Sequence, residues 1–202
     1  MKYITNRIFF DRDFLFLFKI IIDRILYSMF YKRFYKKQFY FYGENIKWGR
    51  DSIWNLIPQS VRISNPSKIQ IGDNCMIDDN VYMQAHHLSE GLIIGSNTRI
   101  NGNVHIQSYS KVLIDANVLI APFCHINSGN HGFDDKDVPI MYQDYKKGGE
   151  IHIGQGSWLG RNATILGGVR LGKNCVIATA AVVTKSFPDN SIVGGIPARI
   201  IK

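Results

Sequence analysis

His131 is the side chain of this sequence that is best placed to do chemistry. It lies in the segment Ser128-Gly129-Asn130-His131-Gly132-Phe133, at the start of a stretch, residues 132–149, that is too polar for a core. A neutral imidazole can take a proton from a hydroxyl near pH 7, so a histidine beside such a loop is a candidate general base. A loop histidine can also make a purely structural hydrogen bond, and the surrounding elements must separate the two interpretations.

Those elements are organised around an aliphatic residue at every sixth position. A small or acidic residue follows each aliphatic one, and a small residue comes four places after it. This period fits neither an amphipathic helix nor an alternating strand, but it suits a short strand and a tight turn repeated three times per eighteen-residue coil. Five triplets share the phase: Ile71, Ile77 and Met83; Ile94, Ile100 and Ile106; Ile114, Ile120 and Ile126; Ile153, Leu159 and Ile165; Leu171, Ile177 and Val183.

Coils of this kind have to stack into an all-β solenoid with parallel strands. Neighbouring coils would lie about 4.8 Å apart and bury a column of aliphatic side chains. Glycines at the second hexad position, such as Gly72 and Gly95, are expected where the backbone bends sharply. Cys75, Cys124 and Cys175 share the small position of the hexad, which predicts cysteines that fill the core and act neither as nucleophiles nor as ligands.

Three interruptions of the eighteen-residue spacing predict loops at an edge of the stack. Five residues are extra between Ile71 and Ile94, two are extra before Ile114, and the largest excess follows Ile126. Insertions leave a solenoid as loops, and long loops in compact folds are more often functional than idle. The loop over residues 132–149 is therefore expected to shape a site.

The repeat resembles the hexapeptide-repeat acyltransferases, and within them most of all the sugar and capsular-polysaccharide O-acetyltransferases. The resemblance covers about residues 63–202. Residues 150–160 (Glu-Ile-His-Ile-Gly-Gln-Gly-Ser-Trp-Leu-Gly) are similar to the signature coil of the family, and residues 180–199 to its closing coil and tail. The resemblance implies a left-handed parallel β-helix, a hand that the general rule for crossovers would not have favoured. It also implies acetyl transfer from acetyl-CoA to a sugar hydroxyl by direct attack, without an acyl-enzyme, with His131 as general base.

Three further side chains are candidate site residues, and the resemblance implies roles for two of them, Trp158 and Asn101. Trp158 should point outward beside the histidine, with its coil near the thioester carbonyl, although it can also pack against a neighbouring subunit. Asn101 matches an asparagine on the acceptor side of the cleft, or it is a turn asparagine with a left-handed backbone. His125 shares its hexad position with His105 of the preceding coil, so the two should lie on one face and either line the acceptor groove or form a surface ladder.

The coenzyme-binding residues that the resemblance implies lie in the last coils. Small residues would leave room for pantetheine, and basic residues would meet the phosphates as cations. Taken singly, each basic residue can also be simply solvated. The set consists of Arg161, Ala163, Ala178, Thr179, Thr184, Lys185, Arg199 and Lys202.

An N-terminal segment differs in composition from the repeat. Residues 1–47 carry ten Lys or Arg against four Asp or Glu, and fifteen aromatic residues precede Gly43. Most of the formal charge of +8 therefore lies outside the repeat, and we expect no nucleic-acid partner. The segment either packs on the solenoid or on another subunit, or makes a peripheral membrane contact through residues 1–42. The expected parts are a basic, aromatic helical segment (1–45), a β-helix (46–188) with the loop 132–149, and a C-terminal tail (189–202).

The sequence thus predicts a homotrimeric O-acetyltransferase that uses acetyl-CoA and no metal. Three cysteines suit a reducing compartment, so we expect a cytoplasmic protein, at most attached to the inner face of the cell membrane. The nearer alternative is an N-acetyltransferase that acts on an aminosugar or an antibiotic. The more distant one is a zinc hydratase resembling the γ-carbonic anhydrases, which would bring His105, His125 and His131 around the metal.

Overall fold

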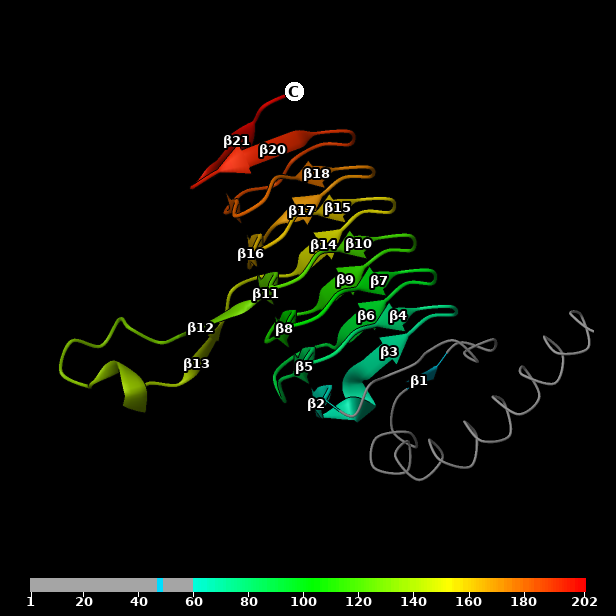
Figure 1. Cartoon of the computed structure of the whole chain (residues 1–202). Helices are drawn as coiled ribbons and strands as arrows, with labels where there is room; N and C mark the ends of the chain where they lie inside the picture. Colours follow the sequence, from blue (N-terminus) through cyan, green and yellow to red (C-terminus); the bar gives the residue numbers. More distant parts are fainter. Residues whose placement is uncertain (1–46, 49–59) are drawn as a thin grey trace, which may run out of the picture. The chain divides into compact units, whose positions relative to one another are not determined.

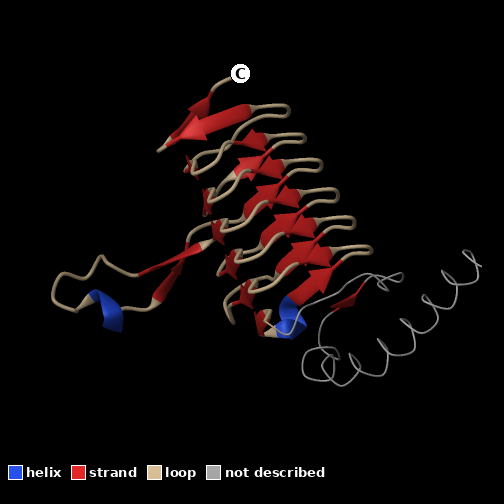
Figure 2. Ribbon diagram, viewed as in Figure 1, coloured by secondary structure: helices blue, strands red, loops and turns tan. Residues whose placement is uncertain are grey.

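The computed structural model describes residues 47–48 and 60–202 (Figure 1). The chain divides into two units, residues 1–44 and residues 45–202, and the expected N-terminal helical segment lies outside the described residues. The described part of the second unit is a column of short strands, a left-handed parallel β-helix, as predicted (Figure 2). In that part of the chain no helix is both long and apolar enough to cross a bilayer.

Each coil contributes one strand to each of three sheets. The first sheet consists of β1 (Lys47–Trp48), β3 (Ile69–Ile71), β6 (Leu92–Ile94), β9 (Val112–Ile114), β14 (Ile151–Ile153) and β17 (Arg170–Leu171). The second consists of β4 (Met76–Ile77), β7 (Arg99–Ile100), β10 (Leu119–Ile120), β15 (Trp158–Leu159), β18 (Val176–Ile177), β20 (Ile192–Gly195) and the antiparallel β21 (Ala198–Ile200). The third consists of β2 (Arg62–Ser64), β5 (Tyr82–Ala85), β8 (His105–Ser108), β11 (His125–Asn127), β16 (Thr164–Leu166) and β19 (Val182–Val183).

Four elements of the described residues lie outside these sheets. The short 3-10 helix η2 (Pro66–Lys68) joins β2 to β3, and a second one, η3 (Ile140–Tyr142), belongs to an insertion between β11 and β14. The same insertion contains the antiparallel pair of β12 (Gly129–His131) and β13 (Tyr145–Lys147). This hairpin, residues 129–147, projects from the column, and we call it the arm (Figure 1).

The aliphatic hexad positions form the core of the column. All fifteen residues of the five predicted triplets are between 0% and 2% exposed. Parallel pairing brings equivalent positions of successive coils into register, so that Ile100 pairs with Ile120 and Ile120 pairs with Leu159. Removing one such side chain from water contributes about 1.5–3 kcal/mol, and only the stack removes it. The prediction of the inward residues is confirmed.

The turns between strands depend on two residue types, asparagine and glycine, whereas the sequence predicted that glycine alone would allow the bend. The backbone with positive φ falls three residues after the aliphatic one, usually on an asparagine, as in Asn74 (φ 53°) and Asn97 (φ 57°). The glycines at the second position are needed for a different reason. A Cβ on Gly72 or Gly95 would collide with the backbone of the next coil, so glycine there permits close stacking.

The three predicted cysteines lie in the core. Cys75, Cys124 and Cys175 are no more than 1% exposed, as expected for small apolar residues. Burial raises the pKa of the Cys124 thiol to about 11, and it raises the pKa of the other two thiols as well. None of the three therefore has the character of a nucleophile.

All three interruptions of the repeat emerge at one corner, between the third and first sheets, where buried serines close the turn. The Ser128 hydroxyl accepts hydrogen bonds from the backbone N–H groups of Tyr109 (2.9 Å) and Ser110 (3.0 Å) and donates to the Ser110 carbonyl (2.7 Å). One coil below, Ser108 shares a 2.6 Å hydrogen bond with Ser89. This network links the three insertions through groups that water does not reach.

Replacing Ser128 by alanine is expected to lower the free energy of unfolding by about 2–3 kcal/mol, because two buried N–H groups lose their acceptor. Denaturant unfolding followed by circular dichroism measures the change. Ser67→Ala is the control, since the exposed Ser67 hydroxyl bonds only to Asn65 among the described residues, and a change within about 0.5 kcal/mol is expected. Equal effects of the two substitutions would contradict the role of the corner network.

Candidate active site

His131 lies at the end of β12, in the arm, and its side chain is exposed. It is in register with Tyr145 on β13. The insertion starts at Gly129 and contains strands of its own, whereas the sequence predicted a loop over residues 132–149. The ring is therefore held on a two-stranded support outside the core, where a substrate can reach it.

A continuous stack of rings connects His131 to the column. Its ring centroid lies 4.3 Å from that of Tyr145, which lies 5.1 Å from Tyr109 and 5.3 Å from His86. Tyr109 and His86 are themselves 4.6 Å apart, and His87 lies 4.1 Å beyond His86. These residues come from the three separate insertions, which the stacking of coils brings to one corner. The candidate base is thereby positioned by aromatic packing.

The inner end of this ring stack is the buried part. Tyr109 is 8% exposed, and burial raises the pKa of its phenol. Burial, and then the neighbouring His87 and Lys68, lower the pKa of His86, which favours the neutral ring. A Cβ on Gly129 would collide with the Tyr109 side chain, so glycine at the root of the arm allows the two to pack. Sequence reasoning assigned no role in the site to His86, Tyr109 or Tyr145, although each lies in one of the three interruptions.

Two ion pairs also help to orient the arm. Lys147 on β13 pairs with Glu90 of the first insertion, and Lys146 pairs with Asp134 inside the arm. The hydrogen bond from Lys147 holds the pKa of the Glu90 carboxyl below its ordinary value. All four side chains are substantially exposed, so these pairs contribute little stability and mainly orient the arm.

Trp158 points outward from β15 of the second sheet and is 48% exposed. The arm leaves the column at the corner between the third and first sheets, which lies opposite the second sheet (Figure 1). One column therefore does not bring Trp158 and His131 together. A site that uses both would need a second copy of the chain.

Asn101 lies at the corner between the second and third sheets and is half-buried. Its side-chain amide donates a 2.8 Å hydrogen bond to the Asp78 carboxylate of the preceding coil. The left-handed residue of this turn is Asn103 (φ 61°), so Asn101 is not the left-handed asparagine that the alternative interpretation required. The contact with Asp78 orients the amide at this corner, away from the arm of its own chain.

His125 and His105 are neighbours on the third sheet, as their shared hexad position predicted. They pair in register, with ring centroids 6.4 Å apart. The His125 Nε2 lies 3.0 Å from the Gln107 side-chain oxygen, and burial, followed by His105, lowers the pKa of His125. Among the described residues, no three His, Cys, Asp or Glu side chains are grouped so that they could hold a metal ion.

The residues expected to bind the coenzyme occupy several places. Arg161 and Thr179 are exposed at the corner between the second and third sheets, in consecutive coils, with Ala178 half-buried beside them. Thr184 and Lys185 are exposed after β19, at a different corner, and Arg199 lies on β21. Lys202 is exposed at the C-terminus. Ala163 is 0% exposed, so the expectation that its side chain lines a groove is wrong, because it faces the core.

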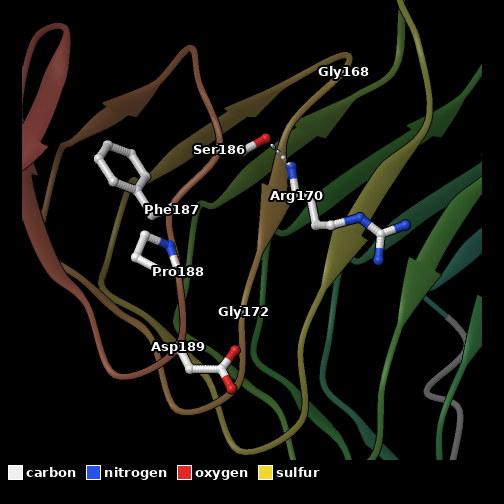
Figure 3. Close-up of a pocket in the computed structure, with 7 residues that line it drawn as sticks. All are labelled: Gly168, Arg170, Gly172, Ser186, Phe187, Pro188 and Asp189. Carbon is white, nitrogen blue, oxygen red and sulfur yellow. Dashed lines mark hydrogen bonds between the residues drawn. The ribbon is translucent and has the colours of Figure 1, made fainter.

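A separate pocket lies where β17 meets the last coil (Figure 3). It has a volume of about 540 Å³ and is lined by Gly168, Arg170, Gly172, Ser186, Phe187, Pro188 and Asp189. The Ser186 hydroxyl accepts a 2.9 Å hydrogen bond from the Arg170 backbone, and Asp189 accepts one of 2.8 Å from the Lys173 backbone. The Ser186 and Asp189 side chains thus bind backbone groups of the turns, and none of the candidate site residues lines the pocket.

Comparison with known proteins agrees with this architecture. The family model described as bacterial transferase hexapeptide (six repeats) matches residues 150–185. A curated relative, "Putative lipopolysaccharide biosynthesis O-acetyl transferase WbbJ" of Escherichia coli strain K12, is 34% identical over 147 residues, which cover 69% of this chain and 74% of the relative. The chain spans 44% to 63% of the next three curated relatives.

Solved structures of other acetyltransferases share the fold. A maltose O-acetyltransferase from Clostridium difficile 630 has a TM-score of 0.56 at 27% identity, covering 65% of this chain and 67% of that one. The hexapeptide-repeat acetyltransferase VCA0836 of Vibrio cholerae, complexed with acetyl coenzyme A, has a TM-score of 0.55 at 27% identity, covering 63% and 67%. With the repeat, the column and these relatives in agreement, the chain belongs to the hexapeptide-repeat transferases and is an enzyme of the acetyltransferase class.

Proposed function

We propose that this enzyme moves an acetyl group from acetyl-CoA to a hydroxyl of a sugar in a bacterial surface polysaccharide or its precursor. The exposed His131, held by stacked rings at the end of β12, carries the proposal. The names of the relatives support the acceptor class, since they include lipopolysaccharide biosynthesis and maltose O-acetyltransferases.

In the proposed reaction His131 accepts the proton of the acceptor hydroxyl. The hydroxyl oxygen attacks the thioester carbonyl carbon directly, and no acyl-enzyme forms. The C–S bond then breaks, and the imidazolium returns its proton to the departing thiolate, so the ring ends neutral. Trp158 and its coil would lie beside the thioester, where a fixed N–H donor stabilises the developing oxyanion.

We assign this site to the cleft between two copies of the chain in a homotrimer. The separation of Trp158 and His131 on one column favours a composite site. The tip of the arm presents Ile140 (57% exposed), Met141 (72%) and Tyr142 (72%), apolar surface that a second copy would cover. The arm of one copy would then bring its imidazole to the second sheet of the next.

The corner between the second and third sheets suits the coenzyme. Gly160 and Ala178 are small residues at equivalent positions of consecutive coils, and Arg161 has no acidic partner among the described residues. Thr179 would line the same groove, and Thr184, Lys185, Arg199 and Lys202 would meet the phosphates where the columns adjoin. Asn101, two coils away at this corner, and His125 would lie on the acceptor side.

Mixing two inactive variants tests the composite site. Trimers of His131→Ala alone or Trp158→Ala alone should be nearly inactive, whereas randomly mixed trimers should recover about a quarter of the wild-type activity, because one interface in four combines both intact residues. A mixture of His131→Ala with His131→Asn should recover none. If the mixture of the first two variants stays as inactive as either parent, the composite site is wrong.

A panel of acceptors with labelled acetyl-CoA tests the chemistry. Sugars that carry only hydroxyls should become labelled, and their amino analogues should gain no faster N-acetylation. Exclusive labelling of amines would instead establish the N-acetyltransferase alternative.

The place of the enzyme in the cell is part of the proposal. The three buried cysteines suit a reducing compartment, and we propose a cytoplasmic enzyme that is at most attached to the inner face of the membrane. The membrane contact through residues 1–42 lies outside the described residues and stays a prediction.

A further inference from the structure

One turn of the column breaks the pattern that the others follow. At the corner between the second and third sheets, each coil has one residue with a left-handed backbone. In four coils this residue is Asn80 (φ 58°), Asn103 (φ 61°), Asn162 (φ 59°) or Ala180 (φ 58°), and in the remaining one it is Phe123 (φ 65°). Asparagine tolerates this region because its side chain bonds locally, whereas a bulky aromatic residue there is strained.

Packing in the core does not compensate for this backbone strain, because Phe123 is 45% exposed. Backbone strain that packing does not require tends to mark a functional position. The hexad itself accommodates asparagine at this place, since Asn103 and Asn162 occupy it in the two adjacent coils. A contact of the Phe123 ring should therefore explain why phenylalanine occupies this strained turn.

That contact is the guanidinium of Arg161, in the next coil at the same corner. Its Cζ lies 4.6 Å from the centre of the Phe123 ring, within the range of a cation–π interaction. Arg161 has no ion pair and no side-chain hydrogen bond with any residue that the structure describes. An aromatic face can fix a guanidinium without occupying its five N–H donors, which an acidic partner would occupy.

We propose that Phe123 is a positioning residue that holds Arg161 so that its free N–H groups bind an oxygen acceptor of the coenzyme. This inference rests on the proposed function, in which Arg161 belongs to the coenzyme groove, and it names the residue that prepares that arginine. The strain of this turn is offset because an ordered guanidinium loses less conformational entropy on binding than a mobile one.

The decisive variant is Phe123→Asn, because stability and affinity should change in opposite senses. Asparagine relieves the strain, so the thermal midpoint should rise by about 2–4 °C. Loss of the ring frees Arg161, so KM for acetyl-CoA should rise about 3- to 10-fold, with kcat and the acceptor KM unchanged. Phe123→Trp, which keeps an aromatic face, should retain the wild-type KM.

Two further variants show that the ring acts through Arg161. In an Arg161→Ala background, Phe123→Asn should add no further increase in KM, because the group that it positions is already absent. Asn97→Phe places a phenylalanine at a left-handed turn on another corner (φ 57°), so it should lower the thermal midpoint and leave KM unchanged.

A shorter donor, acetyl-pantetheine, shows which part of the coenzyme Arg161 binds. If Phe123→Asn raises KM for acetyl-pantetheine as much as KM for acetyl-CoA, the hydrogen-bond acceptor is a pantetheine oxygen. If Phe123→Asn leaves KM for acetyl-pantetheine unchanged, the acceptor is a phosphate.

Calorimetric titration with coenzyme A separates failure of this inference from failure of the proposed function. If the wild type binds coenzyme A and Phe123→Asn binds it equally well, the positioning role is wrong while the acetyltransferase proposal stands. Additive effects of Phe123→Asn and Arg161→Ala would also overturn the positioning role. If the wild type binds no coenzyme A, the proposed function falls and this inference falls with it.

Discussion

Replacing His131 by asparagine is expected to lower kcat by about 10²- to 10⁴-fold, because the acceptor hydroxyl then loses its proposed base. KM for acetyl-CoA should change little, since the side chain lies on the arm and the proposed coenzyme groove lies at another corner. Steady-state kinetics with acetyl-CoA and a sugar acceptor measure both constants. The thermal midpoint should stay close to that of the wild type, because the residue is exposed and contributes no core packing.

His152→Asn is the matched control for this experiment. His152 lies on β14 between Asp115 (3.0 Å) and the Arg170 guanidinium (2.8 Å), on the first sheet, and takes no part in the arm. This variant should lose some stability and keep its kcat. A folded, trimeric His131→Asn protein that transfers acetyl at the wild-type rate would remove the proposed base.

The second large effect is expected from Tyr145→Leu. Tyr145 is the ring between His131 and the column, so leucine breaks the stack at its middle contact. The imidazole would then be less firmly held, and a displacement of about 1 Å costs on the order of 10² in rate. We therefore expect kcat to fall about 10- to 100-fold, with KM for acetyl-CoA within about 2-fold of the wild-type value.

Tyr145→Phe distinguishes positioning from hydroxyl chemistry. It keeps the ring and its contacts with Tyr109 and His86, so it should keep most of the activity. If Tyr145→Phe lowered kcat as much as Tyr145→Leu, the hydroxyl group of Tyr145 rather than its ring would be needed for activity. If leucine were harmless, stacking would play no part in holding His131.

The core of this protein was predictable because a solenoid repeats one local rule. Each hexad meets only the hexads above and below it, so a period of six in the sequence implies one inward position per side of the column. All fifteen predicted positions and all three cysteines lie in the core for this reason. The role of the glycines was misjudged, because close approach between coils is not visible within one hexad. Gly72 and Gly95 avoid the backbone of the next coil, while asparagines such as Asn74 supply the positive φ.

The site was predictable only in part. His131 and Trp158 were found from the loop and from the resemblance, but their roles rest on how copies of the chain meet. The ring stack was missed, because His86, Tyr109 and Tyr145 lie in insertions that the sequence separates by more than a full coil. Ala163 was misassigned because a small residue permits both a groove and a core position, and its burial decides for the core.

By itself, the sequence determined the fold class, the inward residues and the exposed histidine beside the large insertion, since each depends on spacing along the chain. The tertiary structure decided that three insertions converge at one corner, that rings from all of them support His131, and that Phe123 faces Arg161 across a strained turn. The physical reason is that these contacts join residues of different coils. They form only when the coils are stacked in register, so no local sequence pattern predicts them.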